Sequence, residues 1–231
     1  MTRTPNAQFN LASPDAISVR IATQARRRMY GEFIDYFSPR EGEAVLDVGV
    51  TSDRSYTSSN YFEALYPHKS CVTALGLDDA RFLEDQYPGM RFVRGDARDM
   101  PFGDRAFDYV HCAAVLEHVG SANDQHKLIM ECARVARLGM FLTTPNRWYP
   151  IEFHTQLPLL HFLPQSLYRP VYRMLGFGFF AEEANLNLVS ERDVAGMVAG
   201  ISGWRFAVRS QRLLGLKSNI LLLGKRIAEN S

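Results

Sequence analysis

The sequence predicts an α/β fold with a doubly wound, seven-stranded, mostly parallel sheet and an antiparallel C-terminal strand. Short apolar segments alternate with helical patterns along most of the chain, which is typical of βαβ units with right-handed crossovers. Two further apolar segments close the chain with no helix between them, as in an antiparallel pair. The 231 residues, 46% hydrophobic and 22% charged, suffice for one domain spanning 1–231.

The first half of the chain opens with an expected helix over residues 14–37, where Ser13 suits the N-cap and Pro14 the first turn. Apolar residues then recur at spacing four and predict one buried stripe, namely Ile17, Ile21, Ala25, Met29 and Phe33. Apolar runs predict buried strands at 43–49, 70–77, 90–96 and 107–113, with a short helix at 79–89.

The second half keeps this pattern to residue 145 and then departs from it. A helix is expected at 123–137, a strand at 139–145, a helix at 190–200 with Ser190 as N-cap, and strands at 204–214 and 218–226. Between them lies an aromatic, proline-rich insertion at about 146–188. Because long insertions in compact domains are usually functional, we expect it to be a substrate lid.

Composition excludes several functional classes. The net charge of +1 offers no broad electrostatic footprint for nucleic acid. The three cysteines show no metal spacing and suggest reduced core residues of a cytoplasmic protein. The N-terminus has no apolar signal segment, and no run reaches the roughly 20 apolar residues of a membrane span.

Candidate binding residues follow the strands, since ligands of open α/β sheets bind outside the carboxyl ends of the strands. The first such segment reads "VLDVGVTSDRS" at 45–55 and lacks the further glycines that close approach to a ligand usually requires. It is either a ligand loop with unusual chemistry or a turn that binds nothing. A dinucleotide site is disfavoured, because G-x-G-x-x-G is absent.

The segments after the third and fourth strands read "GDARDMPFGDRAFDYV" and "VLEHV". In that order and spacing, together with "LDVG", they resemble the class I S-adenosylmethionine-dependent methyltransferases, and specifically the methyltransferase type 11 group. The resemblance covers about residues 40–145. It implies a Rossmann-like methyltransferase fold, S-adenosyl-L-methionine as the cofactor, and methyl transfer as the activity.

The resemblance also implies cofactor-binding positions. Asp47 and Gly49 match the motif that packs against the methionine part of the cofactor, and Asp96 with Ala97 match the loop beside the adenine. The strand-four end, which flanks the sulfonium side, is matched by Cys112 and Ala113.

Two departures from the family pattern stand in the first two loops. Thr51 and Asp53 replace loop glycines, so that Thr51, Ser52 and Asp53 either contact the ammonium and carboxylate ends of the cofactor or only cap a helix. The acidic residue that holds the ribose hydroxyls falls on Gly76 in the simplest register. Asp78 then either reaches the ribose or serves as a helix N-cap.

The acceptor side offers His118 as a proton acceptor for a hydroxyl, or as a residue that only packs after strand four. Glu117 either orients that ring or forms a surface pair. Some methyltransferases bind a metal on an E-x-x-E-H run. Because Ala114 stands at the first carboxylate position, we expect no metal.

The insertion adds Arg147, Glu152 and His154 among aromatic residues, a plausible wall for an acceptor with hydroxyls or an anionic group. Within 148–180, an apolar row at spacing four and a row with Arg169 and Arg173 also suit a water–lipid boundary, although Pro170 is expected to break the helix. This predicts a cytoplasmic protein with peripheral contact to the inner membrane. Simple covering of the sheet or a dimer contact is the alternative.

The sequence thus predicts methyl transfer to a hydroxyl or similar group of a small-molecule, glycan or lipid-linked acceptor that is not nucleic acid. The alternative is a non-catalytic binding module on the same fold, with a degraded cofactor loop.

Overall fold

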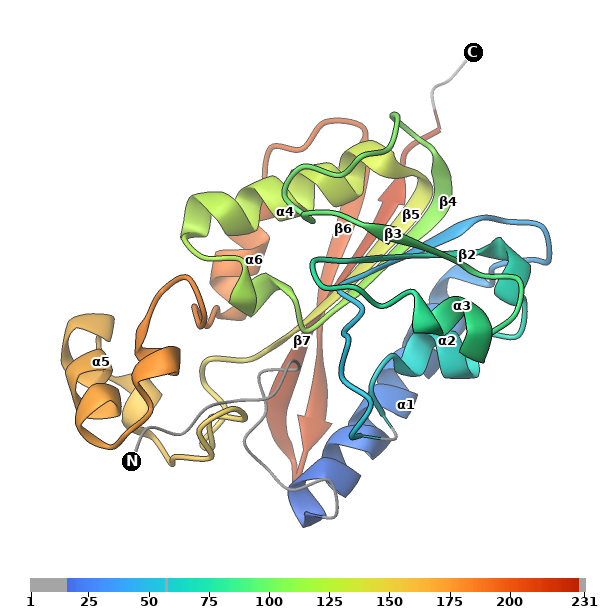
Figure 1. Cartoon of the computed structure of the whole chain (residues 1–231). Helices are drawn as coiled ribbons and strands as arrows, with labels where there is room; N and C mark the ends of the chain where they lie inside the picture. The colour runs from blue at the N-terminus through green and yellow to red at the C-terminus, as the bar shows by residue number, and fades with distance from the viewer. Residues whose placement is uncertain (1–15, 57, 229–231) are drawn as a thin grey trace.

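The computed structural model describes residues 16–56 and 58–228. The strands are β1 (Val45–Val48), β2 (Val72–Gly76), β3 (Arg91–Arg94), β4 (Phe107–Ala113), β5 (Ala136–Pro145), β6 (Trp204–Leu213) and β7 (Leu216–Arg226). They form one seven-stranded sheet in the order β3-β2-β1-β4-β5-β7-β6 (Figure 1). Neighbours among β1 to β5 are parallel, and β7 is antiparallel to both β5 and β6. The predicted fold class is confirmed.

The helices are α1 (Ile17–Phe37), α2 (Tyr61–Leu65), α3 (Phe82–Gln86), α4 (Ala122–Val135), α5 (Gln165–Met174) and α6 (Glu191–Val198), with short 3₁₀ turns η1 (Lys69–Cys71), η2 (Leu116–His118), η3 (Leu160–Phe162) and η4 (Gly178–Ala181). Ser190 caps α6 in a reciprocal capping box with Asp193, as the sequence predicts. No helix in 16–56 or 58–228 has both the length and the apolar character to cross a bilayer.

Two apolar cores lie on opposite faces of the sheet. Side chains of α1, α2 and α3 form one, including Phe33, Phe62 and Leu83. Helices α4 and α6 form the other with Leu128 and Val194. Because both faces are covered, the central strands carry continuous apolar runs, which is why their positions could be predicted.

Helix α1 differs from its prediction at the N-terminal end. Ser13 and Pro14 lie outside the described residues, and the described N-cap is Ala16. The predicted stripe is buried only at Met29 and Phe33, whereas Ile21 is 37% exposed. The even spacing predicts one uniform stripe, whereas the first turns of α1 line a cavity.

The insertion has an apolar core of its own, centred on Tyr168, Tyr172, Phe177 and Phe180. It therefore forms a separate lobe with α5, which stands away from the sheet in Figure 1. Pro170 lies within a continuous α5, so the expected break is wrong.

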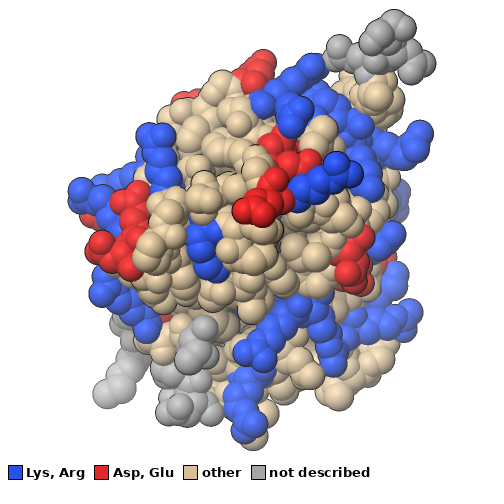
Figure 2. All heavy atoms as spheres, turned by 90° about the vertical axis from the view of Figure 1, so that its right-hand side faces the viewer, with Lys and Arg blue, Asp and Glu red and all other residues tan. Residues whose placement is uncertain are grey.

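On the face that lies to the right in Figure 1, basic side chains are interrupted by uncharged surface and acidic groups (Figure 2).

Candidate active site

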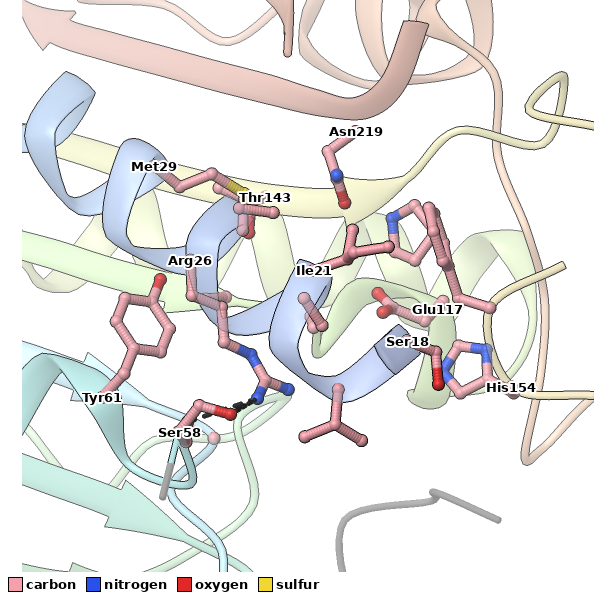
Figure 3. A pocket seen from close by; sticks show the side chains of 18 of the residues that line it. Ser18, Ile21, Arg26, Met29, Ser58, Tyr61, Glu117, Thr143, His154 and Asn219 are labelled. Carbon is pink, nitrogen blue, oxygen red and sulfur yellow. Dashed lines mark hydrogen bonds between the residues drawn. The ribbon is translucent and has the colours of Figure 1, made fainter. Parts of the chain in front are cut away.

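A cavity of about 470 Å³ lies at the carboxyl ends of β1 and β4. The first half of α1 forms one wall, and the start of the insertion forms another. Figure 3 shows Arg26 and Ile21 reaching in from α1, with Glu117 and His154 on the far side. This is the sheet edge at which the strand order predicts a ligand.

Asp47 lies at the floor of this cavity and is paired with His111 on β4. The Nδ1 of His111 faces the Asp47 carboxylate, and the Tyr61 hydroxyl lies 3.1 Å from Nε2 of the same ring. With Nδ1–H donating to the carboxylate, Nε2 accepts from the hydroxyl. Burial lowers the pKa of His111 to about 3 and raises that of Asp47 to about 7.

Glu63 adds a second carboxyl to this cluster. It lies on α2 and is fully buried. Burial, followed by the neighbouring Asp47, raises the pKa of Glu63 well above its ordinary value. A neutral Glu63 beside Asp47 lowers the electrostatic repulsion between the two carboxyls.

Gly49 takes a backbone conformation that only glycine adopts readily, with φ +95°. Its N–H donates to the Leu75 carbonyl at 2.8 Å. A Cβ added at Gly49 would lie 2.1 Å from Cγ2 of Val115. Gly49 therefore lines the cavity and is also required for packing against the segment after β4.

The unusual loop after Gly49 is closed by its own hydrogen bonds. The Thr51 N–H donates to Asn60 Oδ1 at 2.8 Å, and Asn60 Nδ2 donates back to the Thr51 carbonyl. The Asp53 carboxylate accepts from the hydroxyls of Ser55 and Ser59. Thr51 lines the cavity, whereas Ser52 and Asp53 do not. The Thr51 hydroxyl oxygen also accepts from the Asp53 N–H at 3.1 Å, so both side chains that replace the family glycines stabilise the loop.

The predicted adenine and ribose residues lie outside this cavity. A Cβ at Gly76 would lie 2.6 Å from the Val50 carbonyl, so no acidic side chain fits there. Asp78 is exposed, and its predicted alternative as an N-cap is wrong because Arg81 is the N-cap of α3. Both oxygens of Asp96 accept from Arg98, which lowers the pKa of Asp96.

Ala97 and Cys112 are buried in the core shared with α4 and α6. Alternation along β4 places Cys112 on the face opposite Asp47 and His111, while Ala113 lines the cavity. Of the two residues predicted to flank the cofactor, Ala113 therefore lines the cavity, whereas the Cys112 side chain faces the core.

The acceptor-side candidates are brought together in part. Glu117, His118 and His154 all line the cavity, with the two imidazole rings 4.7 Å apart. Burial lowers the pKa of His118 to about 3, so this ring is neutral at pH 7 but a weak proton acceptor. Glu152 lies behind His154, to which its carboxylate is hydrogen-bonded at 2.7 Å.

Arg147 is not at this site. Its guanidinium donates to the Leu163 carbonyl and lies over the Trp148 ring. The Arg147 side chain therefore does not line the cavity, and its role at the acceptor stays a prediction.

Three residues of the site had not been predicted. His111 was detectable as a polar residue in an apolar strand, whereas Tyr61 belongs to a helix too short to predict. Arg26 is partly buried and lines the cavity, where its guanidinium donates to the Ser58 hydroxyl at 2.6 Å. It begins the run Arg26–Arg28, and the sequence alone does not indicate which of these arginines points into the cavity.

Residues 47–143 match the sequence pattern of a methyltransferase domain family. Over 122 residues the chain is 32% identical to a proposed methyltransferase of Encephalitozoon cuniculi, a match that covers 49% of this chain and 50% of that protein. The chain thus spans about half the length of the curated relative it matches.

Solved methyltransferase structures share the fold. A S-adenosylmethionine-dependent methyltransferase of Methanosarcina mazei has a TM-score of 0.51 at 19% identity, covering 85% of this chain and 98% of that one. Magnesium protoporphyrin IX methyltransferase of Synechocystis PCC 6803, with bound S-adenosylhomocysteine, has a TM-score of 0.55 at 16% identity, covering 90% and 85%. The family match confirms the methyltransferase resemblance, and these structures confirm that the fold is shared.

Proposed function

We propose that this chain, whose residues 47–143 carry the methyltransferase domain pattern, transfers a methyl group from S-adenosylmethionine to an acceptor bound in the cavity. The observation that carries the proposal is the convergence of the motif residues Asp47 and Gly49 with Glu117, His118 and His154 in one cavity. Methyl transfer from a sulfonium is an in-line displacement, so the protein must chiefly align the acceptor and exclude water.

The floor of the cavity suits the amino-acid end of the cofactor. The partly buried Arg26 guanidinium is complementary to a carboxylate, and Asp47 to an ammonium group. Gly49 keeps side-chain atoms away from the strand end between them. The cavity volume of about 470 Å³ lies within the usual range for small-molecule sites.

The finer proposal concerns the acceptor, which we take to be a hydroxyl or similar group of a small-molecule, glycan or lipid-linked compound. An apolar mouth favours an amphiphilic molecule, because Ile21, Ile151 and Leu214 line the cavity and are 37%, 47% and 89% exposed. Leu214 also has φ +51°, an unfavourable conformation for a leucine. A strained, exposed apolar residue at the mouth is consistent with ligand contact.

Peripheral contact with the inner surface of the cytoplasmic membrane remains part of this proposal. Helix α5 buries Tyr168 and Tyr172, while Leu167 and Met174 are 56% and 78% exposed. Arg173 is paired with Glu182 at 2.9 Å, and Arg169 lies 4.0 Å from Glu183. The attraction to lipid would therefore come from the apolar side chains more than from the arginines.

Calorimetric titration with S-adenosylmethionine and S-adenosylhomocysteine tests the proposal. We expect one site for each ligand on the full chain. A chain that binds neither ligand would not be a S-adenosylmethionine-dependent enzyme. A chain that binds both, but releases no S-adenosylhomocysteine with any amphiphilic hydroxyl compound, would support the non-catalytic alternative.

A further inference from the structure

Glu117, His118 and His154 form a compact cluster on the cavity wall. Each offers one potential metal-ligand atom, and these atoms all lie within 4.8 Å of one another. Glu117 and His118 belong to η2 after β4, whereas His154 comes from the insertion. The methyl-transfer proposal assigns this cluster no metal.

The two imidazole rings are each held through Nδ1. The Nδ1 of His118 lies 2.7 Å from the Asn185 carbonyl, to which it can only donate. The Nδ1 of His154 lies 2.7 Å from Glu152 Oε1. In the neutral form of each ring Nε2 is then the nitrogen with a lone pair, and in His118 it lies 3.9 Å from Glu117 Oε1. A carbonyl or carboxylate on the remote nitrogen is the usual support of a metal-binding histidine.

Glu117 is likewise held through one of its two carboxylate oxygens. Its side chain is fully buried, and Oε2 accepts from the Thr144 hydroxyl at 2.9 Å. Oε1 has no hydrogen-bond partner among the residues that the structure describes. A buried carboxylate oxygen without a partner is costly, because the lost hydration is not replaced. A cation at the centre of the cluster would supply the interaction that this oxygen lacks.

We propose that Glu117 Oε1, His118 Nε2 and His154 Nε2 bind one divalent first-row transition-metal ion, with Zn²⁺ as the representative case. Two imidazoles and one carboxylate are a ligand set of open zinc sites, in which a further coordination position stays available. Mg²⁺ and Ca²⁺ are disfavoured because they prefer oxygen ligands. A tetrahedral ion holds its ligand atoms about 3.4 Å apart, so only small side-chain rotations are needed.

This proposal replaces the sequence-based expectation of no metal. That expectation rested on Ala114, which cannot supply the first carboxylate of an E-x-x-E-H run. The structure instead brings in His154, which is far from Glu117 and His118 along the chain. If methyl transfer to a hydroxyl is also correct, the ion would bind the acceptor oxygen at its open coordination position and polarise it.

Zinc binding is measured directly, without cofactor or acceptor. The chelator-treated full chain is titrated with Zn²⁺ by calorimetry, and we expect one site per chain and no comparable site for Mg²⁺. Glu117→Gln and His154→Gln should each weaken Zn²⁺ binding by about 100-fold or more, and Thr144→Val by about tenfold. His126→Gln is the matched control, because His126 is exposed on α4 and should bind no less zinc than the parent.

A measurement on the unmodified chain covers the case in which a variant does not fold. With ¹⁵N-labelled histidine, saturating Zn²⁺ should shift the Nε2 resonances of two of the six histidines. Absence of a one-to-one zinc site, or unchanged affinity in folded Glu117→Gln and His154→Gln, would overturn the proposal. Such a result leaves cofactor binding untouched, just as failure to bind S-adenosylmethionine leaves the zinc titration valid.

Discussion

Arg26 is the arginine of the run Arg26–Arg28 that lines the cavity. It is partly buried, whereas the next two arginines on the same helix are exposed. Burial lowers its pKa, but an arginine remains charged at neutral pH. Its guanidinium is therefore available to a ligand carboxylate.

We expect Arg26→Gln to weaken S-adenosylmethionine binding by roughly 10- to 150-fold, since a hydrogen bond to a charged group contributes about 1.5–3 kcal/mol. Arg27→Gln removes the same charge from the exposed side and should bind normally. Calorimetry on both variants, with thermal melts to verify folding, provides the measurement. Equal affinities in the two variants would remove Arg26 from the site.

Gly49 is constrained by the protein as well as by the proposed ligand. We expect Gly49→Ala to lower the free energy of unfolding by about 2–5 kcal/mol, because the positive φ is strained and the new Cβ overlaps Val115. Val115→Ala in the same chain should restore part of the loss. Denaturant unfolding of the two single variants and the double variant measures this coupling. Strictly additive effects would contradict the packing role.

At the scale of elements, the insertion is a lobe with an apolar core of its own. Its tyrosines and phenylalanines pack on one another, and its end is joined to the loop after β4. The Asn187 N–H donates to the Glu117 carbonyl at 2.8 Å, and Asn187 Nδ2 donates to the Gly120 carbonyl. These bonds position the lobe beside the cavity while one side of α5 stays exposed.

The exposed side of α5 predicts membrane binding through apolar contacts. If the chain sediments with anionic vesicles, replacing Leu167 and Met174 with Glu should reduce the bound fraction by tenfold or more, since each buried side chain contributes roughly 1.5–3 kcal/mol. Leu65→Glu on α2 is the control, because Leu65 is also exposed but lies on another element. Failure of the parent chain to sediment would assign α5 to a soluble acceptor or a protein partner.

The buried carboxyl of Glu63 links the site to the stability of the whole molecule. Its folded pKa is raised well above the ordinary value, so the folded chain keeps a proton that the unfolded chain releases above about pH 4.3. Its stabilising contribution is therefore fully present below that pH and is lost as pH rises towards the folded pKa.

Glu63→Gln should remove this loss. The difference in the free energy of unfolding, variant minus parent, should increase by up to about 1.4 kcal/mol per pH unit between pH 5 and pH 7. Urea unfolding at several pH values provides the comparison, with the exposed Glu41→Gln as control. Parallel pH curves for Glu63→Gln and the parent would show that Glu63 ionises normally in the folded protein.

The sequence by itself determined the order and type of the main elements. Strands such as β4 are buried on both faces and therefore read as continuous apolar runs, and local chemistry marks the Ser190 cap. The motif at the end of β1 also indicated where Asp47 and Gly49 would lie, because parallel strands end at one edge of the sheet.

Only the tertiary structure decided how the site is composed. Local patterns do not encode the direction of a side chain on an irregular segment, so Arg147, which turns outward, and His154, which turns inward, looked alike in the sequence. The same holds for Arg26 among its neighbours. Their positions depend on contacts between distant segments, such as Asn185 with His118 and Ser58 with Arg26, which exist only once the chain is folded.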